Sequence, residues 1–277
     1  MRPILSLLIA FFPLACSAQV VAHNAISDLP APPVASPNQA GTETGFLNRS
    51  VVLNGTTYRY QIFVPGSYVP SQRWPVILSL HGAGERGSDG YLQTQIGVGA
   101  AIRQNVARFP AIAVFPQATA ESSWTGTLAR VALMALDQTT REYQTDPARV
   151  YLTGLSMGGN GTWYIAYRNP DRFAAIAPIC SWVSPYFWKI DPIVPPDSGD
   201  YFSAIARQLR QVPTWIFHGE VDPVVPVENS RKMFAAMQAA GGRVQYTEIP
   251  GTGHNAWDPT YNSPKFWAWL FAQRKGS

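Results

Sequence analysis

The sequence predicts an α/β fold built on an eight-stranded, mainly parallel sheet with helices on both faces. Short apolar runs alternate along the chain with longer helical patterns, and such alternation is typical of a parallel sheet that helices cover on both sides. A hydrophobic fraction of 46% and a charged fraction of 14% exclude a disordered tail and a coiled coil. The 277 residues are enough to bury a large core.

The predicted strands follow from turn residues and apolar runs. Asn54-Gly55 is the strongest short signal for a hairpin, so the first two strands are expected to be antiparallel. The strands are predicted at 49–53, 57–65, 75–80, 111–116, 149–153, 174–179, 213–218 and 244–249. Helical patterns lie among them at 128–143, 162–167, 227–240 and 264–274. No repeat and no second shift in composition appears, so one folded domain is expected.

The N-terminal residues have the pattern of an export signal. Arg2 precedes an apolar run at 4–14, and the small residues at 15–18 form a cleavage site. We therefore expect a signal peptide at 1–18, a Pro/Ala-rich tether at 19–45 and the folded domain at 46–277, in a protein exported to the periplasm or outside the cell. A buried N-terminal helix and lipid attachment at Cys16 remain as alternatives. The apolar run is too short to cross a bilayer, so no transmembrane segment is predicted.

Charge and cysteine content narrow the classes of partner. The formal charge is +4, and removal of Arg2 with the signal would leave 4 − 1 = +3. The basic residues are scattered without a Lys/Arg stripe, which argues against nucleic acid as a partner. Cleavage would also leave Cys180 as the one internal cysteine of a chain that has two, so no internal disulfide is expected. The sequence does not indicate an oligomeric state.

The strand at 149–153 runs into the motif Gly154-Leu155-Ser156-Met157-Gly158, which a helix follows. A serine on such a strand-to-helix elbow has a strained backbone that points its hydroxyl out above the sheet. Glycine is expected at 154 and 158 because a Cβ there would clash where strand and helix approach. Ser156 is therefore the candidate nucleophile.

A serine needs a base to take its proton, and the base needs an acid to fix its tautomer. On this fold the order is serine, acid, histidine. His254 is the one histidine that can follow both, since the other three lie before the acid candidates. Asp222 follows the strand at 213–218 and is the predicted acid; Glu220 is its rival, and Asp258 has the wrong order.

The turn after the strand at 75–80 is the expected source of an oxyanion hole. In His81-Gly82-Ala83-Gly84 a backbone amide can turn toward the serine. The amides of Ala83 and Met157 are the predicted donors. His81 itself is expected to brace the turn rather than to act in the chemistry, and Glu85-Arg86 to form an ion pair that shapes it.

Four ordered motifs resemble the α/β-hydrolase superfamily: His-Gly-Ala-Gly-Glu-Arg-Gly at 81–87, Gly-Leu-Ser-Met-Gly-Gly at 154–159, Phe-His-Gly-x-x-Asp-Pro-Val-Val-Pro at 217–226 and Pro-Gly-Thr-Gly-His at 250–254. The chain is most similar to the secreted esterase-like branch, which includes feruloyl and acetyl-xylan esterases, polyhydroxybutyrate depolymerases and predicted peptidases. The resemblance covers residues 46–275. It implies an α/β-hydrolase catalytic domain with the triad Ser156, Asp222 and His254, and it leaves the substrate open.

The leading hypothesis is a serine hydrolase that cleaves carboxylic esters through an acyl-enzyme without a cofactor. The alternative is a serine peptidase of the prolyl-oligopeptidase type that acts on short peptides, although the roughly 27 residues between Gln19 and Phe46 cannot build the propeller of such enzymes. A binding protein on a hydrolase scaffold would lack one member of the triad. No metal or nucleotide motif is present in the sequence.

A proline-rich loop from Ser181 to Tyr201 is expected to form one wall of the substrate cleft, because loops at the carboxyl ends of the strands overhang the nucleophile. Trp182 and Trp188 on this loop, and Trp124 after the fourth strand, are the predicted substrate-binding side chains. Flat apolar rings suit an aryl acyl group or a sugar face better than a long lipid chain. The expected substrates are small-molecule or polysaccharide-linked esters of short or aromatic acids.

Overall fold

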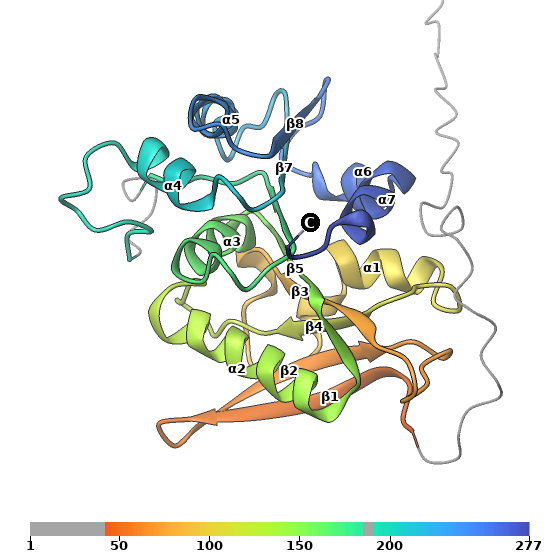
Figure 1. The fold of residues 1–277 in the computed structure, drawn as a ribbon. Coiled ribbons are helices and arrows are strands. Elements are labelled where there is room, and N and C mark those ends of the chain that lie inside the picture. The colour runs from red at the N-terminus through yellow and green to blue at the C-terminus, as the bar shows by residue number, and fades with distance from the viewer. Residues whose placement is uncertain (1–41, 185–190, 277) are drawn as a thin grey trace, which may run out of the picture.

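The computed structural model describes residues 42–184 and 191–276 (Figure 1). Residues 1–41, which hold the predicted export signal and most of the predicted tether, lie outside the described residues, as does the predicted Trp188. The eight strands are β1 (Gly45–Leu53), β2 (Thr56–Val64), β3 (Trp74–Leu80), β4 (Ile112–Pro116), β5 (Thr145–Leu155), β6 (Ala175–Ile179), β7 (Thr214–Gly219) and β8 (Val244–Ile249).

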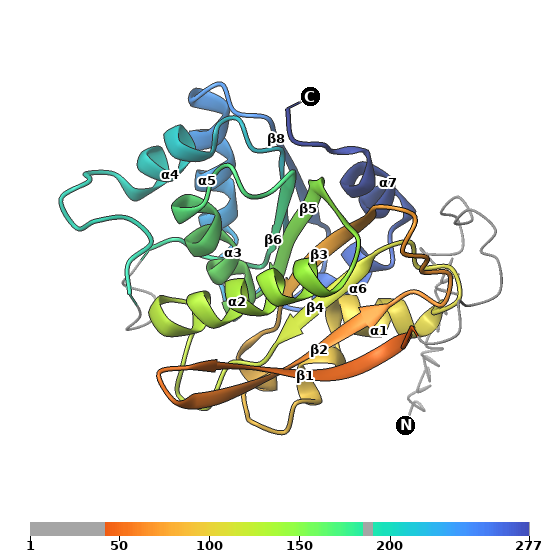
Figure 2. The same ribbon diagram turned by 60° about the horizontal axis from the view of Figure 1, so that its bottom comes forward.

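These strands form one sheet in the order β1-β2-β4-β3-β5-β6-β7-β8. β2 is antiparallel to both of its neighbours, β1 and β4, and the other neighbouring pairs are parallel. Figure 2 shows that the sheet twists from β1 across to β8, as large β-sheets usually do. The predicted fold class and the hairpin at Asn54-Gly55 are confirmed.

Both faces of the central strands are buried, which explains their continuous apolar runs. In β3, Val76 and Leu78 pack into one core cluster while Ile77 packs into the other, because successive side chains of a strand point to opposite faces. Val114 and Phe115 of β4 divide in the same way. A strand buried on both faces keeps no polar alternation.

The helices divide between these two clusters. The described helices are α1 (Gly97–Gln104), α2 (Gly126–Glu142), α3 (Met157–Arg168), α4 (Tyr201–Leu209), α5 (Glu228–Ala239), α6 (Trp257–Tyr261) and α7 (Pro264–Ala272), with short 3₁₀ turns η1 (Ala83–Glu85) and η2 (Leu92–Thr94). Buried side chains of α2, α3, α4 and α5 join one cluster, and those of α1, α6 and α7 join the other, as the two sides of the sheet in Figures 1 and 2 show. Among the described residues, no helix combines the length and the apolarity that crossing a membrane requires.

The helix after the elbow begins earlier than the sequence predicts. Its expected start was 162, but α3 begins at Met157, directly after Ser156. The first turn contains Gly158, Gly159 and Gly161, which have low helix propensity, so local pattern alone hides this turn. These glycines are needed for close tertiary contacts and do not themselves favour a helix.

The glycines let the helix start press against the neighbouring strand. A Cβ on Gly158 would lie 2.1 Å from the carbonyl oxygen of Leu80, and one on Gly154 would lie 2.3 Å from that of Gly158. Both contacts are with backbone, which cannot rotate away. The clash expected at 154 and 158 is therefore confirmed, and it fixes how closely β5, α3 and the end of β3 approach.

We predict that Gly158→Ala destabilises the protein by more than about 3 kcal/mol, although alanine favours a helix over glycine by about 1 kcal/mol. Urea unfolding followed by circular dichroism measures the change. Gly66→Ala is the control, because a Cβ at Gly66 meets no atom within 4 Å, and its effect should stay within about 1 kcal/mol. A folded Gly158→Ala protein of normal stability would contradict the close approach.

Candidate active site

Ser156 occupies the turn between β5 and α3, where its backbone has φ 53° and ψ −117°. A residue other than glycine is strained in this region, at a cost of about 1–3 kcal/mol. The Ser156 amide donates to the Ile179 carbonyl at 2.9 Å, and its own carbonyl accepts from the Asn160 amide at 3.1 Å. These bonds to β6 and to the first turn of α3 hold the strained conformation.

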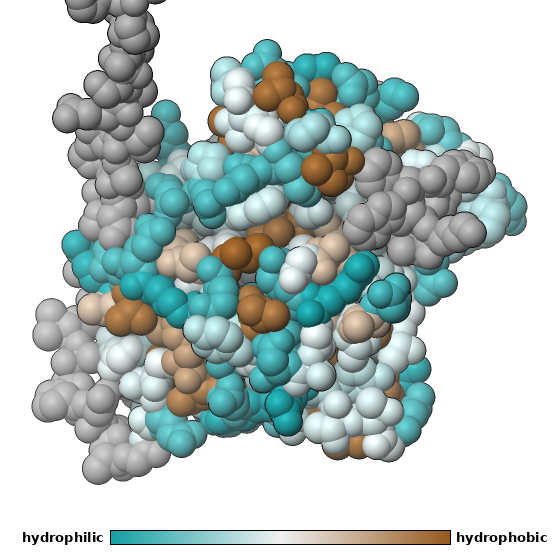
Figure 3. All heavy atoms as spheres, turned by 180° about the vertical axis from the view of Figure 1, so that it is seen from behind, coloured by the Kyte–Doolittle hydropathy of each residue, from teal (hydrophilic) through white to brown (hydrophobic). Residues whose placement is uncertain are grey.

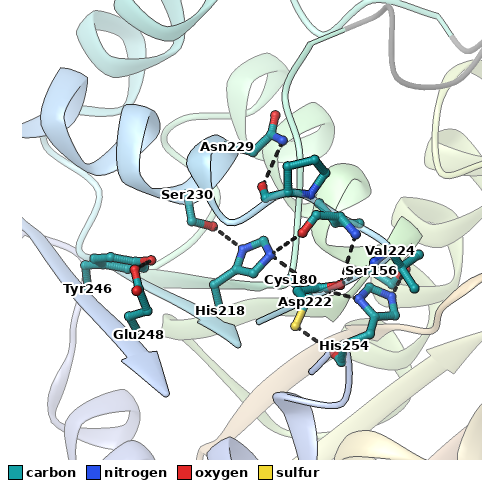
Figure 4. Close-up of polar contacts among 12 residues, drawn as sticks. Ser156, Cys180, His218, Asp222, Val224, Asn229, Ser230, Tyr246, Glu248 and His254 are labelled. Atoms are coloured by element: carbon teal, nitrogen blue, oxygen red, sulfur yellow. Dashed lines mark hydrogen bonds and ion pairs between the residues drawn. The ribbon is translucent and has the colours of Figure 1, made fainter. Parts of the chain in front are cut away.

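The three residues predicted as a triad lie together, although they come from the ends of three different strands (Figure 4). His254 Nε2 lies 3.0 Å from Ser156 Oγ, and His254 Nδ1 lies 2.7 Å from Asp222 Oδ2. Since an ionised carboxylate only accepts, Nδ1 donates to Asp222 and leaves Nε2 free to accept from the serine. The His254 side chain is 19% exposed and that of Asp222 is fully buried.

The buried Asp222 carboxylate is hydrogen-bonded from every side. Oδ1 accepts from the amides of Val224 at 2.8 Å and Val225 at 3.0 Å, and Oδ2 faces the rings of His254 and His218. Burial would by itself raise the pKa of Asp222, but the hydrogen bonds from the two histidines and the two amides outweigh it and hold this pKa well below its usual range. Asp222 is therefore ionised at neutral pH.

The rival acid, Glu220, lies in the same loop but has another contact. Its Oε2 accepts from the Gly251 amide at 2.8 Å, so it ties the loop that carries His254 to the end of β7. Asp258 instead accepts from the Asn255 side chain. Of these three carboxylates, Asp222 is the one that His254 contacts in the structure.

The two predicted oxyanion donors share a position in their elements: Ala83 is the first residue of η1, and Met157 is the first of α3. The first amides of a helix have no acceptor within it. A Cβ on Gly82 would lie 3.7 Å from Ser156 Cβ, which puts the turn containing Ala83 directly beside the serine. The arrangement suits two amides aimed at an oxygen above Ser156.

His81 fixes the orientation of the Gly82–Ala83 peptide. Its Nε2 accepts from the Ala118 amide at 2.9 Å, so Nδ1 carries the proton and donates to the Gly82 carbonyl at 2.6 Å. In a trans peptide the carbonyl and the following amide point in opposite directions, so this bond turns the Ala83 amide away from His81. The brace expected from the sequence is present. Glu85 also acts on this turn, since its carboxylate accepts from the Gly82 amide at 3.0 Å.

The two predicted tryptophans that the structure describes, Trp124 and Trp182, do not form an open cleft wall. Trp124 is 0% exposed and Trp182 is 1% exposed, and Trp124 Nε1 donates to the His81 carbonyl at 2.9 Å. This burial contradicts the prediction that both rings line the substrate cleft. Trp124 packs edge-on against His81, whose carbonyl precedes the Gly82–Ala83 turn, and Trp182 belongs to the core.

Two buried side chains beside the site were not predicted from the sequence. His218 contacts Asp222, and Cys180, with φ 48°, lies 3.0 Å through its Sγ from the His254 carbonyl. His218 belongs to the Phe-His-Gly motif. The expected chain order of serine, acid and histidine excludes it as the base, and the sequence indicates no other role for it. The signal for Cys180 was its place directly after β6, the strand beside the elbow.

A metal ion does not fit the group formed by Cys180, Asp222 and His254. One donor atom from each of the three lies within 4.8 Å of the others. However, burial raises the pKa of the Cys180 thiol to about 12, and metals bind the thiolate. Asp222 and His254 use their facing atoms for each other.

Comparison with known proteins supports a hydrolase. The model of the prolyl oligopeptidase family matches residues 130–273, slightly more than half of the chain. The chain belongs to the prolyl oligopeptidase family. The predicted resemblance to the α/β-hydrolase superfamily is confirmed.

This member of the prolyl oligopeptidase family is also similar to several esterases. The crystal structure of a thermostable esterase has a TM-score of 0.70 and 34% identity, covering 83% of this chain and 63% of that one. A ferulic acid esterase of known structure shares the fold, with a TM-score of 0.61 and 19% identity over 82% of this chain and 97% of that one. The bifunctional acetylxylan esterase/xylanase XynS20E of Neocallimastix patriciarum is 26% identical over 52% of this chain and 19% of its own length. The chain spans 19–45% of the lengths of the curated relatives that it matches.

We predict that His81 makes the stability of this family member depend on pH. Burial lowers the pKa of His81 to about 4, whereas an unfolded chain has about 6.5. Because the unfolded state binds the extra proton between these values, stability is lost as the pH falls from about 6.5 to about 4. Between pH 7.5 and 4.5, wild-type protein should lose about 2–3 kcal/mol more than His81→Gln in urea unfolding. Equal losses in both proteins would contradict the buried neutral ring.

Proposed function

We propose that the protein is an exported serine hydrolase that cleaves carboxylic esters through an acyl-enzyme, with Ser156, His254 and Asp222 as its triad. The observation that carries the proposal is the continuous hydrogen-bonded chain from Ser156 Oγ through the His254 ring to Asp222, at 3.0 and 2.7 Å. Export rests on the pattern of residues 1–18 alone.

In the proposed reaction, His254 Nε2 takes the proton of Ser156 Oγ as the oxygen attacks the ester carbonyl. The negative oxygen of the tetrahedral intermediate accepts hydrogen bonds from the amides of Ala83 and Met157. His254 then gives its proton to the leaving alcohol, and the acyl group stays on Ser156. Water repeats the sequence and releases the acid. Asp222 stays ionised and stabilises the His254 imidazolium that forms in both halves.

A peptidase is the second candidate, because the matching family is named for prolyl oligopeptidases and the same geometry can attack an amide. The amine that leaves from a peptide is a poorer leaving group than the alcohol that leaves from an ester, so the two activities differ in substrate binding and in the delivery of a proton to nitrogen. The esterase of 34% identity favours the ester reading. Direct comparison of ester and peptide substrates decides between the two.

We predict that Ser156→Ala lowers the rate of ester hydrolysis by about 10⁴-fold or more without loss of folding, because the nucleophile is absent. Hydrolysis of p-nitrophenyl acetate and circular dichroism measure the two properties. A fluorophosphonate should add to Ser156 of the wild-type protein, as peptide mass spectrometry identifies. More than a few per cent of residual activity in Ser156→Ala would reject Ser156 as nucleophile.

The neighbouring carboxylates provide a matched control for the acid. Asp222→Asn should lower kcat by about 10⁴-fold, because an amide cannot favour the tautomer that leaves Nε2 unprotonated. Glu220→Gln should have a mild effect, since the amide oxygen can still accept from Gly251. The reverse order of effects would assign the acid to Glu220.

The proposed substrates carry short or aromatic acyl groups, and polysaccharide-linked esters are included. With Trp124 and Trp182 buried, support comes from an acetylxylan esterase among the relatives and from the surface. On the face seen in Figure 3, hydrophobic residues form small patches separated by hydrophilic ones. The described residues on this face form no broad apolar surface of the kind that could meet a lipid layer. The exposed apolar side chains beside the acid are small ones, Val221 and Val224.

We predict that kcat/KM for acetyl, butyryl and feruloyl esters exceeds that for acyl chains beyond about eight carbons by about tenfold or more. The small exposed side chains Val221 and Val224 would shield little of a long acyl chain from water. A panel of p-nitrophenyl esters, methyl ferulate, an acetylated sugar and a peptide anilide measures this preference. Preference for long chains would reject the proposed acyl class, and faster cleavage of the anilide would support the peptidase instead.

A further inference from the structure

His218 is a fully buried histidine at the end of β7, four residues before Asp222. Its ring lies between α5 and the turn at 222–225 (Figure 4). Nδ1 lies 2.7 Å from Ser230 Oγ, while Nε2 lies 2.9 Å from the Val225 carbonyl oxygen and 3.2 Å from Asp222 Oδ2. The ring thus contacts a helix on one side and the acid turn on the other.

The contacts of His218 fix the position of its ring proton. The Val225 carbonyl and the ionised Asp222 carboxylate can only accept, so Nε2 carries a hydrogen and donates to both. Ser230 can then donate its hydroxyl hydrogen to Nδ1, so both ring nitrogens have a partner. Since Ser230 is 2% exposed, water does not compete for this hydroxyl.

The position of this donor matters because Asp222 Oδ2 is the same oxygen that accepts from His254 Nδ1. The carboxylate therefore has four donors: two amides on Oδ1 and two imidazoles on Oδ2. Through Val225, His218 also holds the backbone that supplies one of those amides. A single side chain thus controls both the charge environment of the acid and the shape of its turn.

The other titratable groups around His218 are bonded elsewhere. Glu248 of β8 is paired in register with His218 and accepts from Tyr246 at 2.6 Å and from Arg231. From the end of β6, Cys180 faces the far side of Asp222 and donates to the His254 carbonyl. The close carboxylate contact of His218 is thus the one to Asp222.

We propose that His218 is a positioning residue of the triad: its Nε2–H aims Asp222 Oδ2 at His254 and sets how strongly that carboxylate holds the His254 proton. The proposal rests on the proposed function, since it gives Asp222 the role of the acid. Sharing Oδ2 between two donors weakens its pull on the His254 proton. Removing the His218 donor would leave His254 as the one side-chain donor on this oxygen, and the protonated ring would persist to higher pH.

The test compares His218→Leu, which has no donor, with His218→Gln, whose amide N–H can reach a similar distance. We expect His218→Leu to lower kcat for p-nitrophenyl acetate about tenfold or more with little change in KM, and to move the rise of kcat/KM with pH upward by about half a pH unit or more. His218→Gln should restore most of both values. Thermal unfolding shows that each variant is folded.

Ser230→Ala tests the same role without changing the histidine. Ser230→Ala removes the hydroxyl that holds Nδ1, so the ring can shift and the contact of its Nε2–H with Asp222 becomes weaker. A smaller change in the same direction is expected for both kcat and the pH profile. This variant decides the outcome if His218→Leu does not fold.

The proposal is overturned if folded His218→Leu keeps wild-type kcat and pH profile, or if it loses activity with an unchanged pH profile and His218→Gln is equally impaired. When His218→Leu is unfolded, an unchanged pH profile in Ser230→Ala overturns it. Ser156→Ala is assayed in parallel: retained activity in that variant rejects the proposed function itself, whereas loss in Ser156→Ala with normal His218 variants rejects only the positioning role.

Discussion

The strained backbone of Ser156 is the constraint on which the rest of the site depends. At φ 53° this residue turns the chain from β5 into α3 within one residue, and the unfavourable conformation survives only because its surroundings fix it. Its amide is bonded to β6, and Gly158 presses the helix start against the carbonyl of Leu80. The same close approach brings the turn after β3, with Gly82 and Ala83, beside the serine. The proposed nucleophile and the turn proposed to bind the oxyanion are thus positioned by the same close packing.

A second constraint is the burial of a charge. An isolated carboxylate without exposure would be neutral or would destabilise the fold, but Asp222 has four donors and keeps a depressed pKa. Those donors come from its own turn, from β7 and from the loop after β8. The burial of this charge is therefore compensated only when these elements are assembled. The electrostatics of the site therefore depend on how the C-terminal half of the sheet packs.

Much of this architecture can be predicted from the sequence because it depends on local chemistry. Strands β4 and β6 are continuous apolar runs and β3 is nearly so. Asn54-Gly55 specifies the first hairpin, and chain order separates His254 from the other histidines. Tertiary contacts account for the errors. The early start of α3 depends on glycines that contact another strand. Trp124 can be buried because its Nε1 donates a hydrogen bond to the His81 carbonyl. An aromatic residue in a loop gives the same sequence signal whether its ring lines a cleft or packs in the core below it.

His218 shows why a motif can be noticed without being understood. The order of serine, acid and histidine identifies the base by excluding every histidine before the acid, so the rule that finds His254 also dismisses His218. The structure gives the two rings a common partner, Asp222 Oδ2, at 2.7 and 3.2 Å. A histidine four residues before the acid can reach it because the turn at 222–225 folds back over the end of β7. In this chain the sequence Phe-His-Gly-x-x-Asp therefore provides the carboxylate together with one of its donors.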